Sequence, residues 1–222
     1  MRALSILCCT LLAAAAHGDE PERDKSKPET TTPSVSAAPL AYIPPASIGA
    51  PRNRTVGAAS RSARLPGPTV YSLVPEHTGQ TVSAQPSLFW YLDSLPPKDT
   101  PMYFTLTNDE EIDPIAEIQL MNVSEPGIQR VDLAKHDIKL ERGTEYEWTI
   151  AVVIDPDRRA NDVVTAGWVI VVEEPEGLEP TARGYAANGL WYDAIASASD
   201  DLRAQLLREV GLGEVLERPP SD

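Results

Sequence analysis

Cysteine is almost absent from this chain, since Cys8 and Cys9 are the only two. Both lie in an apolar N-terminal segment that has the pattern of a signal peptide. Once that segment is removed, the protein has no thiol. Disulfide bonds, a cysteine nucleophile and a cysteine metal site are then excluded, and stability must come from packing alone.

Long hydrophobic runs are also lacking. The apolar stretch near the start of the chain, residues 3–16, is too short to span a bilayer. It follows a basic Arg2, and small residues separate it from the charged Asp19 and Glu20, as in a secretory signal peptide. We therefore predict a signal peptide over residues 1–18 and an exported protein, periplasmic or extracellular, without stable membrane insertion. A single membrane anchor is the alternative.

Positive charge is scarce, with 19 Lys and Arg against 33 Asp and Glu and a net charge of −14. Residues 19–66 carry seven basic and five acidic residues, a net of +2, whereas residues 67–222 carry eleven and twenty-eight, a net of −17. Such an acidic domain repels nucleic acid and anionic lipid, and no basic stripe offsets the repulsion. The acidity indicates either solubility alone or an acidic binding face.

Aromatic residues are missing from nearly all of residues 19–66, where Tyr42 is the only one among eight prolines. Such a segment cannot bury enough apolar surface to offset the entropy of ordering it. We predict a disordered, Pro/Ser/Ala-rich linker over residues 19–66. A docking role is the alternative for Pro44-Pro45 and for a small cluster of arginines, Arg52, Arg54, Arg61 and Arg64.

Short apolar or alternating runs dominate residues 67–175 and are separated by turn residues. Seven such runs are present: 69–74, 87–92, 102–107, 115–121, 128–133, 146–154 and 163–172. Seven short strands in about one hundred residues predict an immunoglobulin/fibronectin-like antiparallel sandwich.

The residues before the sixth run have the spacing of a tyrosine corner, Leu140, Gly143 and Tyr146. In this motif the phenol bonds back to the backbone just upstream and fixes the loop before an inner strand. Tyr146 and Trp148 then share one face of an alternating strand. We expect Trp90, on a second inner strand, to join Trp148 in a core without disulfides.

The period changes after residue 175, where apolar residues recur at helical spacing. They are Ala186, Leu190, Trp191, Ala194, Ile195 and Ala198, followed by Leu202, Leu206, Leu207 and Val210. We predict a helical hairpin over residues 176–216 that packs on the sandwich, with Asp200 as N-cap of its second helix and Gly211 near its end. Residues 217–222 are expected to be frayed.

Residues that carry chemistry are few. His77 and His136 each adjoin an acid, but neighbours in sequence rarely face each other, and no nucleophile motif accompanies them. Acidic loops at residues 109–113 and 155–157 could hold calcium if they met at one end of the sandwich, although neither has the spacing of a calcium loop. We expect no enzyme, metal or cofactor, with a carboxylate-based hydrolase as the alternative.

Three aromatic residues and an acid are the candidate binding residues: Trp168, Trp191, Tyr192 and Asp193. Exposed aromatics bind sugar rings or the apolar side chains of a partner. Aromatics at such positions also commonly join packed elements, which here would be the helices and the sheet. Asp193 would then bond an indole or a phenol across that joint, or cap a backbone group.

Several motifs follow one another in an order that resembles the bacterial exported proteins of domain of unknown function 928. They are Leu73-Val-Pro-Glu76, Gln85-Pro-Ser-Leu-Phe-Trp-Tyr91, Phe104-Thr-Leu106, Gly127-Ile128, Leu140-x-x-Gly143-x-x-Tyr146-x-Trp148, Asp155-Pro-Asp-Arg158 and Tyr185-Ala-x-x-Gly189-x-Trp191-Tyr-Asp-Ala194. The resemblance covers about residues 70–210. It implies a secreted or periplasmic bacterial protein, and it supplies no activity or catalytic residues.

These patterns lead us to expect a non-enzymatic protein-interaction module outside the cytoplasm, with an envelope or secreted protein as partner. Sandwich loops or an exposed edge strand would bind that partner. An extracytoplasmic carbohydrate-binding protein, which would use exposed aromatics and acidic loops, is the alternative.

Overall fold

A computed structural model of the chain describes residues 40–46, 56–57, 67–121 and 123–217, all within one compact unit, Ala38–Asp222. The predicted signal peptide and most of the predicted linker and tail lie outside these residues. Within the part described, no helix combines the length and the apolar character needed to cross a membrane.

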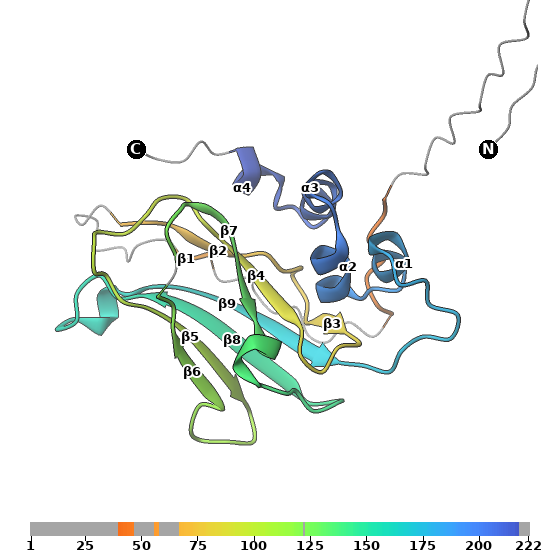
Figure 1. The fold of residues 1–222 in the computed structure, drawn as a ribbon, viewed down its shortest axis with the longest axis horizontal. Coiled ribbons are helices and arrows are strands. Elements are labelled where there is room, and N and C mark those ends of the chain that lie inside the picture. Colours follow the sequence, from red (N-terminus) through yellow and green to blue (C-terminus); the bar gives the residue numbers. More distant parts are fainter. Residues whose placement is uncertain (1–39, 47–55, 58–66, 122, 218–222) are drawn as a thin grey trace, which may run out of the picture. The chain divides into compact units, whose positions relative to one another are not determined.

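The described residues form a mostly β fold, with strands in two sheets (Figure 1). The first sheet has the order β1-β2-β4-β7, formed by Val56–Gly57, Val70–Ser72, Ser87–Leu92 and Gly127–Asp132. The second has the order β3-β9-β8-β5-β6, formed by Gly79–Thr81, Val163–Val171, Glu145–Val152, Met102–Asn108 and Ala116–Gln119. Neighbouring strands are antiparallel except β3 and β9, which run parallel. Two short 3₁₀ helices, η1 (Leu133–His136) and η2 (Arg159–Asn161), lie in the connections.

Both sheets contribute to one hydrophobic core. In β8, Tyr146, Trp148 and Ile150 are buried while the residues between them are half-buried, so the predicted alternation is present. Trp90 of β4 is 1% exposed and belongs to the same core as Trp148. The two tryptophans thus fill the interior from opposite sheets, as the sequence predicts.

The predicted tyrosine corner is also present. The Tyr146 hydroxyl accepts a hydrogen bond of 3.0 Å from the backbone N–H of Glu141. Gly143 has a φ of +82°, a conformation that favours glycine, and its N–H donates to the carbonyl of Val171. Leu140 beside them is buried. This corner fixes the turn that leads into β8.

The strand count exceeds the prediction. Each of the seven predicted runs contains a strand, but β1 and β3 are additional, and β3 occupies residues that we expected to form a turn. Gly79-Gln80-Thr81 has no apolar alternation, so periodicity cannot reveal it. Its strand character comes from pairing with β9, and because this pairing is parallel, the second sheet is mixed rather than antiparallel.

Part of the predicted linker belongs to the fold. Leu40 and Tyr42 are 4% and 8% exposed and lie in the hydrophobic core, and Val56–Gly57 forms β1 against β2. The prediction of disorder for residues 19–66 is therefore wrong for these stretches. That prediction used the average composition of the segment. An average does not reveal that two apolar side chains, Leu40 and Tyr42, pack into the core.

Four short helices take the place of the predicted hairpin in the described residues: α1 (Ala182–Ala187), α2 (Trp191–Ser197), α3 (Asp200–Glu209) and α4 (Gly213–Glu217). The first expected helix is interrupted at Gly189, which has a φ of +73°. Ser199 rather than Asp200 is the N-cap of α3, and its hydroxyl accepts from the N–H of Leu202. Gly211, with a φ of +75°, follows the end of α3 as predicted.

Tyr192 connects α2 to the second sheet and is 1% exposed. Its hydroxyl accepts a hydrogen bond of 2.9 Å from the indole N–H of Trp148 in β8. The same hydroxyl donates to the carbonyl of Trp168 in β9, at 2.8 Å. Burial raises the pKa of this phenol, so it stays protonated and can make both bonds.

The residues on either side of Tyr192 make further attachments. The Trp191 indole N–H donates to the carbonyl of Leu73, just after β2, at 2.9 Å. The Asp193 carboxylate accepts from the Thr81 hydroxyl at 3.1 Å and from the backbone N–H of Val82 at 3.0 Å. Trp191, Tyr192 and Asp193 therefore bond α2 to the segment after β2 and to strands β3, β8 and β9 of the second sheet. We call these three residues the α2 clamp.

We expect Tyr192→Phe to lower the free energy of unfolding by about 2–4 kcal/mol, because it removes the acceptor of the buried Trp148 indole N–H and the hydroxyl that donates to the Trp168 carbonyl. Urea unfolding followed by circular dichroism measures the loss. Tyr185→Phe is the matched control, since the Tyr185 phenol on α1 makes no hydrogen bond to a described residue, and its change should stay within about 0.5 kcal/mol. Equal effects of the two substitutions would contradict the clamp.

Candidate binding cleft at the sheet edges

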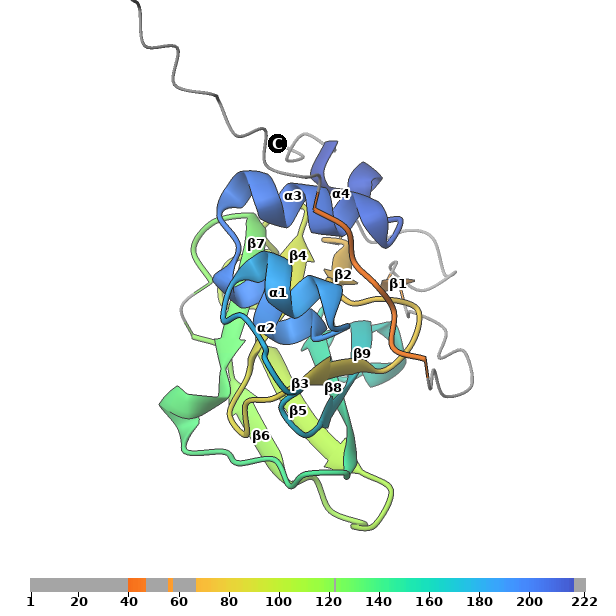
Figure 2. The ribbon, with the colours of Figure 1, turned by 90° about the vertical axis from the view of Figure 1, so that its right-hand side faces the viewer.

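The strands β6 and β7 are the last strands of their sheets on the same side of the fold. Residues 120–126 connect them, so the chain crosses here from the second sheet to the first. The helices lie elsewhere, with α2 against β3 and β4, and none of α1–α4 covers β6 (Figures 1 and 2). The β6 edge therefore lacks the helical cover that β3 has.

Two hollows lie beside this crossing. One, of about 190 Å³, lies between the crossing segment and β7 with η1, and the other, of about 600 Å³, lies between the same segment and the β4–β5 connection. They share one wall, formed by Gln119, Leu120, Met121 and Val123. Met121 is 75% exposed on this wall, and Leu95 on the far side of the larger hollow is 45% exposed. We call the two hollows together the edge cleft.

The indole of Trp90 lines the smaller hollow. Its ring is in the core, yet its Nε1–H has no hydrogen-bond partner among the described residues. The buried indoles of Trp148 and Trp191 both have an acceptor at 2.9 Å. A buried N–H without an acceptor costs about 1–3 kcal/mol.

Three other buried polar atoms lack a partner within the described residues: Ser72 Oγ, Gln85 Nε2 and Asp162 Oδ1. None of them lines the edge cleft. Of these four residues, Trp90 is the one that lines the edge cleft.

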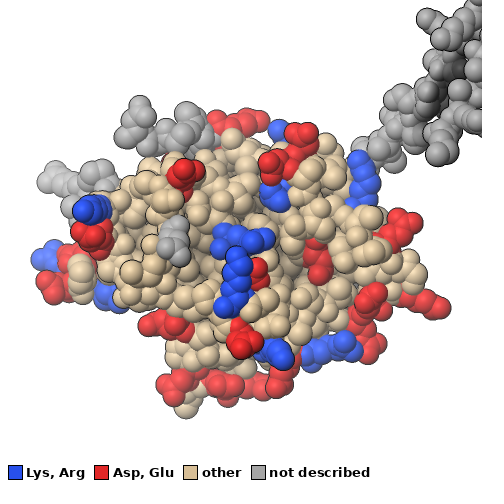
Figure 3. All heavy atoms as spheres, in the orientation of Figure 1, with Lys and Arg blue, Asp and Glu red and all other residues tan. Residues whose placement is uncertain are grey.

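The charge at the smaller hollow differs from that of the domain. Arg130, Lys135 and His136 line it with one acid, Asp132, whose carboxylate lies 3.9 Å from the Arg130 guanidinium. Residues 67–222 as a whole carry a net charge of −17. Figure 3 shows Lys and Arg atoms gathered in the middle of the face on which β7 lies, with Asp and Glu atoms around them. The cleft is therefore a basic spot on an acidic domain.

Of the four predicted binding residues, Trp191 and Tyr192 are 0% and 1% exposed, and their indole N–H and hydroxyl are bonded within the α2 clamp. Asp193 caps a backbone group there, and burial raises the pKa of its carboxyl against the opposing effect of its hydrogen bonds. Trp168 is half-buried on the outer face of the second sheet. Trp191 and Tyr192 therefore join the helices to the sheets, which is the alternative that the sequence left open, because helical periodicity does not distinguish a packed face from a free one.

The histidines occupy separate places. His136 lies at the edge cleft. His77 is 9% exposed, with Nδ1 bonded to the carbonyl of Thr78 at 2.9 Å and Nε2 3.3 Å from the Tyr42 hydroxyl. The part of the chain that the structure describes contains no cluster of three or more His, Cys, Asp or Glu side chains suited to a metal ion.

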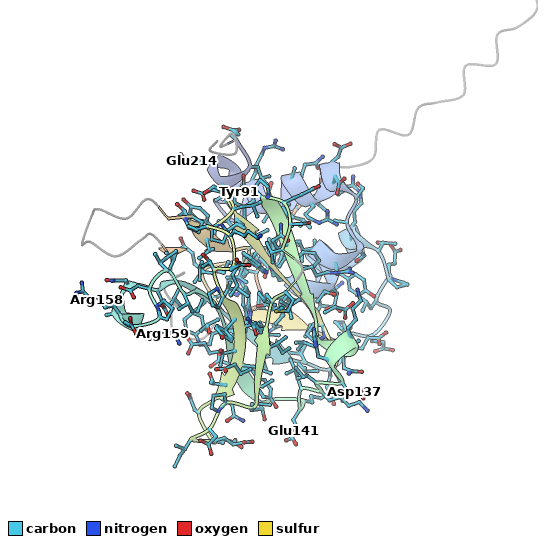
Figure 4. All side chains as sticks on the ribbon, turned by 60° about the vertical axis from the view of Figure 1, so that its left-hand side comes forward. Tyr91, Asp137, Glu141, Arg158, Arg159 and Glu214 are labelled. Atoms are coloured by element: carbon cyan, nitrogen blue, oxygen red, sulfur yellow. The ribbon has the colours of Figure 1, made fainter. Side chains whose placement is uncertain are left out.

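The two acidic loops do not meet. Asn108 at the end of β5 pairs with Tyr146 at the start of β8, whereas Val152 at the end of β8 pairs with Met102. The loop after β5 and the loop after β8 therefore lie at opposite ends of the sheet. In Figure 4, Arg158 and Arg159 mark the loop after β8, far from Glu141, which precedes β8. The arrangement that calcium binding required is absent.

Comparison with known protein families identifies this chain's family. A family model described as Domain of Unknown Function (DUF928) matches residues 56–219. No curated protein matches the chain. The matched residues include both sheets, the edge cleft and the α2 clamp.

We expect Trp90→Phe to destabilise the protein less than Trp148→Phe, by about 2 kcal/mol. The first substitution removes an unpartnered N–H, whereas the second breaks the bond to Tyr192. The loss of ring volume is the same in both variants, which makes them matched controls for each other. Urea unfolding followed by far-ultraviolet circular dichroism measures the difference. A loss for Trp90→Phe that equals or exceeds that for Trp148→Phe would mean that the Trp90 N–H is satisfied.

Proposed function

We propose that this protein, which belongs to the family described as Domain of Unknown Function (DUF928), is a non-enzymatic module that binds an extended segment of a partner protein in the edge cleft. The family description assigns no reaction, so the proposal rests on the cleft itself. The signal-peptide pattern of residues 1–18 supports a site of action outside the cytoplasm, in the periplasm or beyond.

We also propose that the two sheets are an immunoglobulin-like sandwich enlarged by β1 and β3. The tyrosine corner before β8 supports this assignment, as does the core shared by Trp90 and Trp148. A hydrogen bond of 2.9 Å from the Ser72 N–H to the Thr165 hydroxyl joins the two sheets directly.

The observation that carries the binding proposal is the buried, unpartnered N–H of Trp90 beside uncovered strand edges. An extended peptide presents a carbonyl oxygen at every residue, and carbonyl oxygen is the acceptor that an indole N–H takes elsewhere in this core. The outer side of β7 faces no strand, so a peptide can also add to it by strand pairing.

The side chains around the cleft suggest the composition of the bound segment. Exposed Met121 and Leu95 would cover apolar side chains of the peptide. Arg130 and Lys135 favour an acidic residue next to them, and the acidic remainder of the domain repels acidic segments elsewhere. The favoured ligand is therefore an extended segment that combines apolar and acidic residues.

Carbohydrate binding remains as the second candidate because Trp168 is half-buried on the outer face of the second sheet. Thr149 lies on the same face, two residues along β8 from Glu147, which pairs with Trp168. The burial of Trp191 and Tyr192 removes the other two aromatics that this function would use.

The four tryptophans allow the two functions to be separated in one experiment. Peptides selected from a displayed random library, and a set of bacterial oligosaccharides, are each added to ¹⁵N-labelled protein. The four indole N–H signals are assigned by single Trp→Phe substitutions. We expect selected peptides to shift the Trp90 signal and to leave the Trp148 and Trp191 signals in place.

Two arginine variants serve as a matched pair. Val123→Arg fills the wall of the edge cleft and should weaken peptide binding at least tenfold. Thr149→Arg places the same charge on the outer sheet face and should change it less than twofold. If oligosaccharides shift the Trp168 signal, Thr149→Arg abolishes that shift and no peptide moves the Trp90 signal, the protein is a carbohydrate-binding module and our proposal fails.

A further inference from the structure

The segment Leu40–Ala46 lies against the helices although it belongs to no helix or strand. Figure 2 shows it in orange as it runs past α1. Its backbone is attached at one point, where the N–H of Ile43 donates to the carbonyl of Ala186 in α1, at 3.0 Å. The side chains of Leu40 and Tyr42 are buried, whereas that of Ile43 is 55% exposed. The segment thus docks through alternate side chains, as an extended peptide does.

Tyr42 is the anchor of this segment. Its ring packs edge-on against Trp191, with centroids 5.2 Å apart, and stacks on His77 at 6.0 Å. Its hydroxyl lies 3.3 Å from His77 Nε2 and donates to the carbonyl of Gly189 at 3.4 Å. A single aromatic side chain therefore fills a site with an apolar floor and two polar partners, the composition of a recognition pocket.

Gly189 lets the segment approach closely. A Cβ atom on this residue would lie 3.0 Å from the Ile43 carbonyl oxygen and 3.1 Å from Cδ of Pro45. The φ of +73° at the same residue favours glycine independently. The turn between α1 and α2 is therefore shaped to the backbone of a peptide that contains proline.

The residues that form the groove lie within the family match, whereas the segment that fills the groove does not. The groove residues His77, Ala186, Gly189 and Trp191 fall within the family match at residues 56–219, and the segment 40–46 falls outside it. Pockets for alternate side chains and a backbone hydrogen bond are what a peptide-binding groove offers to any extended segment of the right pattern.

We propose that the groove between His77 and the α1–α2 turn is a peptide-binding site for an extended Leu-x-Tyr-x-Pro-Pro segment, and that the chain's own residues 40–45 fill it in cis. The same pattern on a second copy of this chain is the ligand that would enter it in trans. This site is separate from the edge cleft and does not depend on the function proposed for the cleft.

A tethered segment competes at an effective concentration on the order of millimolar. The wild-type groove is therefore closed to a free peptide at micromolar concentration. Removal of the anchor from the tethered copy opens the groove to that peptide, because the apparent affinity rises with the fraction of groove that is free.

The test uses the full chain and a fluorescent peptide with the sequence of residues 38–47. We expect the Tyr42→Ala chain to bind the peptide at least tenfold more tightly than the wild-type chain, as measured by fluorescence anisotropy. A peptide in which its own tyrosine is alanine should not bind. Ile43→Ala is the matched control, since the Ile43 side chain is exposed, and this chain should behave as wild type.

A second substitution locates the binding. Gly189→Val in the Tyr42→Ala chain places side-chain atoms where Ile43 and Pro45 approach, and it should abolish peptide binding. The Trp191 indole signal should respond to the peptide while the Trp90 signal does not, which separates this site from the edge cleft. Two results overturn the proposal. One is a folded Tyr42→Ala chain that does not bind the peptide. The other is a Tyr42→Ala chain that no longer unfolds cooperatively, because the segment is then an inseparable part of the core.

Discussion

The hydroxyl of Tyr192 is the contact on which the described fold depends. It satisfies the indole N–H of Trp148 and the carbonyl of Trp168 at once, in a place that water does not reach. A displacement of α2 would break both hydrogen bonds at once. Trp191 and Asp193 extend the same attachment to Leu73 and the end of β3, which makes α2 part of the β structure rather than an appendage to it.

The position of α2 also determines where the protein is open. Helices cover the side of the fold that carries β3 and β4, and they leave β6 without cover. Helices that pack on the sheets shield them from solvent. Strand edges that no helix or strand covers remain accessible to a partner. Trp90, whose N–H has no partner among the described residues, lines the smaller hollow beside β6, whereas the buried indoles near α2 are bonded. The position of α2 therefore accounts both for the side that the helices cover and for the side that they leave accessible.

The sequence predicts well the features that depend on local pattern. Short apolar or alternating runs located the seven strand segments, and the spacing of Leu140, Gly143 and Tyr146 located the corner. It fails where a contact is distant in the chain. β3 has no apolar pattern and exists only through β9, and the docked position of Tyr42 depends on a groove formed by residues 77–191. The edge cleft has no signal in the sequence, since Trp90 has the pattern of an ordinary core residue.

The parallel pair β3–β9 has a consequence for the order in which the molecule assembles. Gln80 pairs with Ile170, ninety positions later, and the residues that fasten this pair, at 191–193, are translated after all nine strands. The pairing of β3 with β9 is thus a late step that joins residues far apart in the chain. Folds with many such contacts form slowly. A growing chain therefore cannot complete the β3–β9 pair until residues 191–193 have been synthesised.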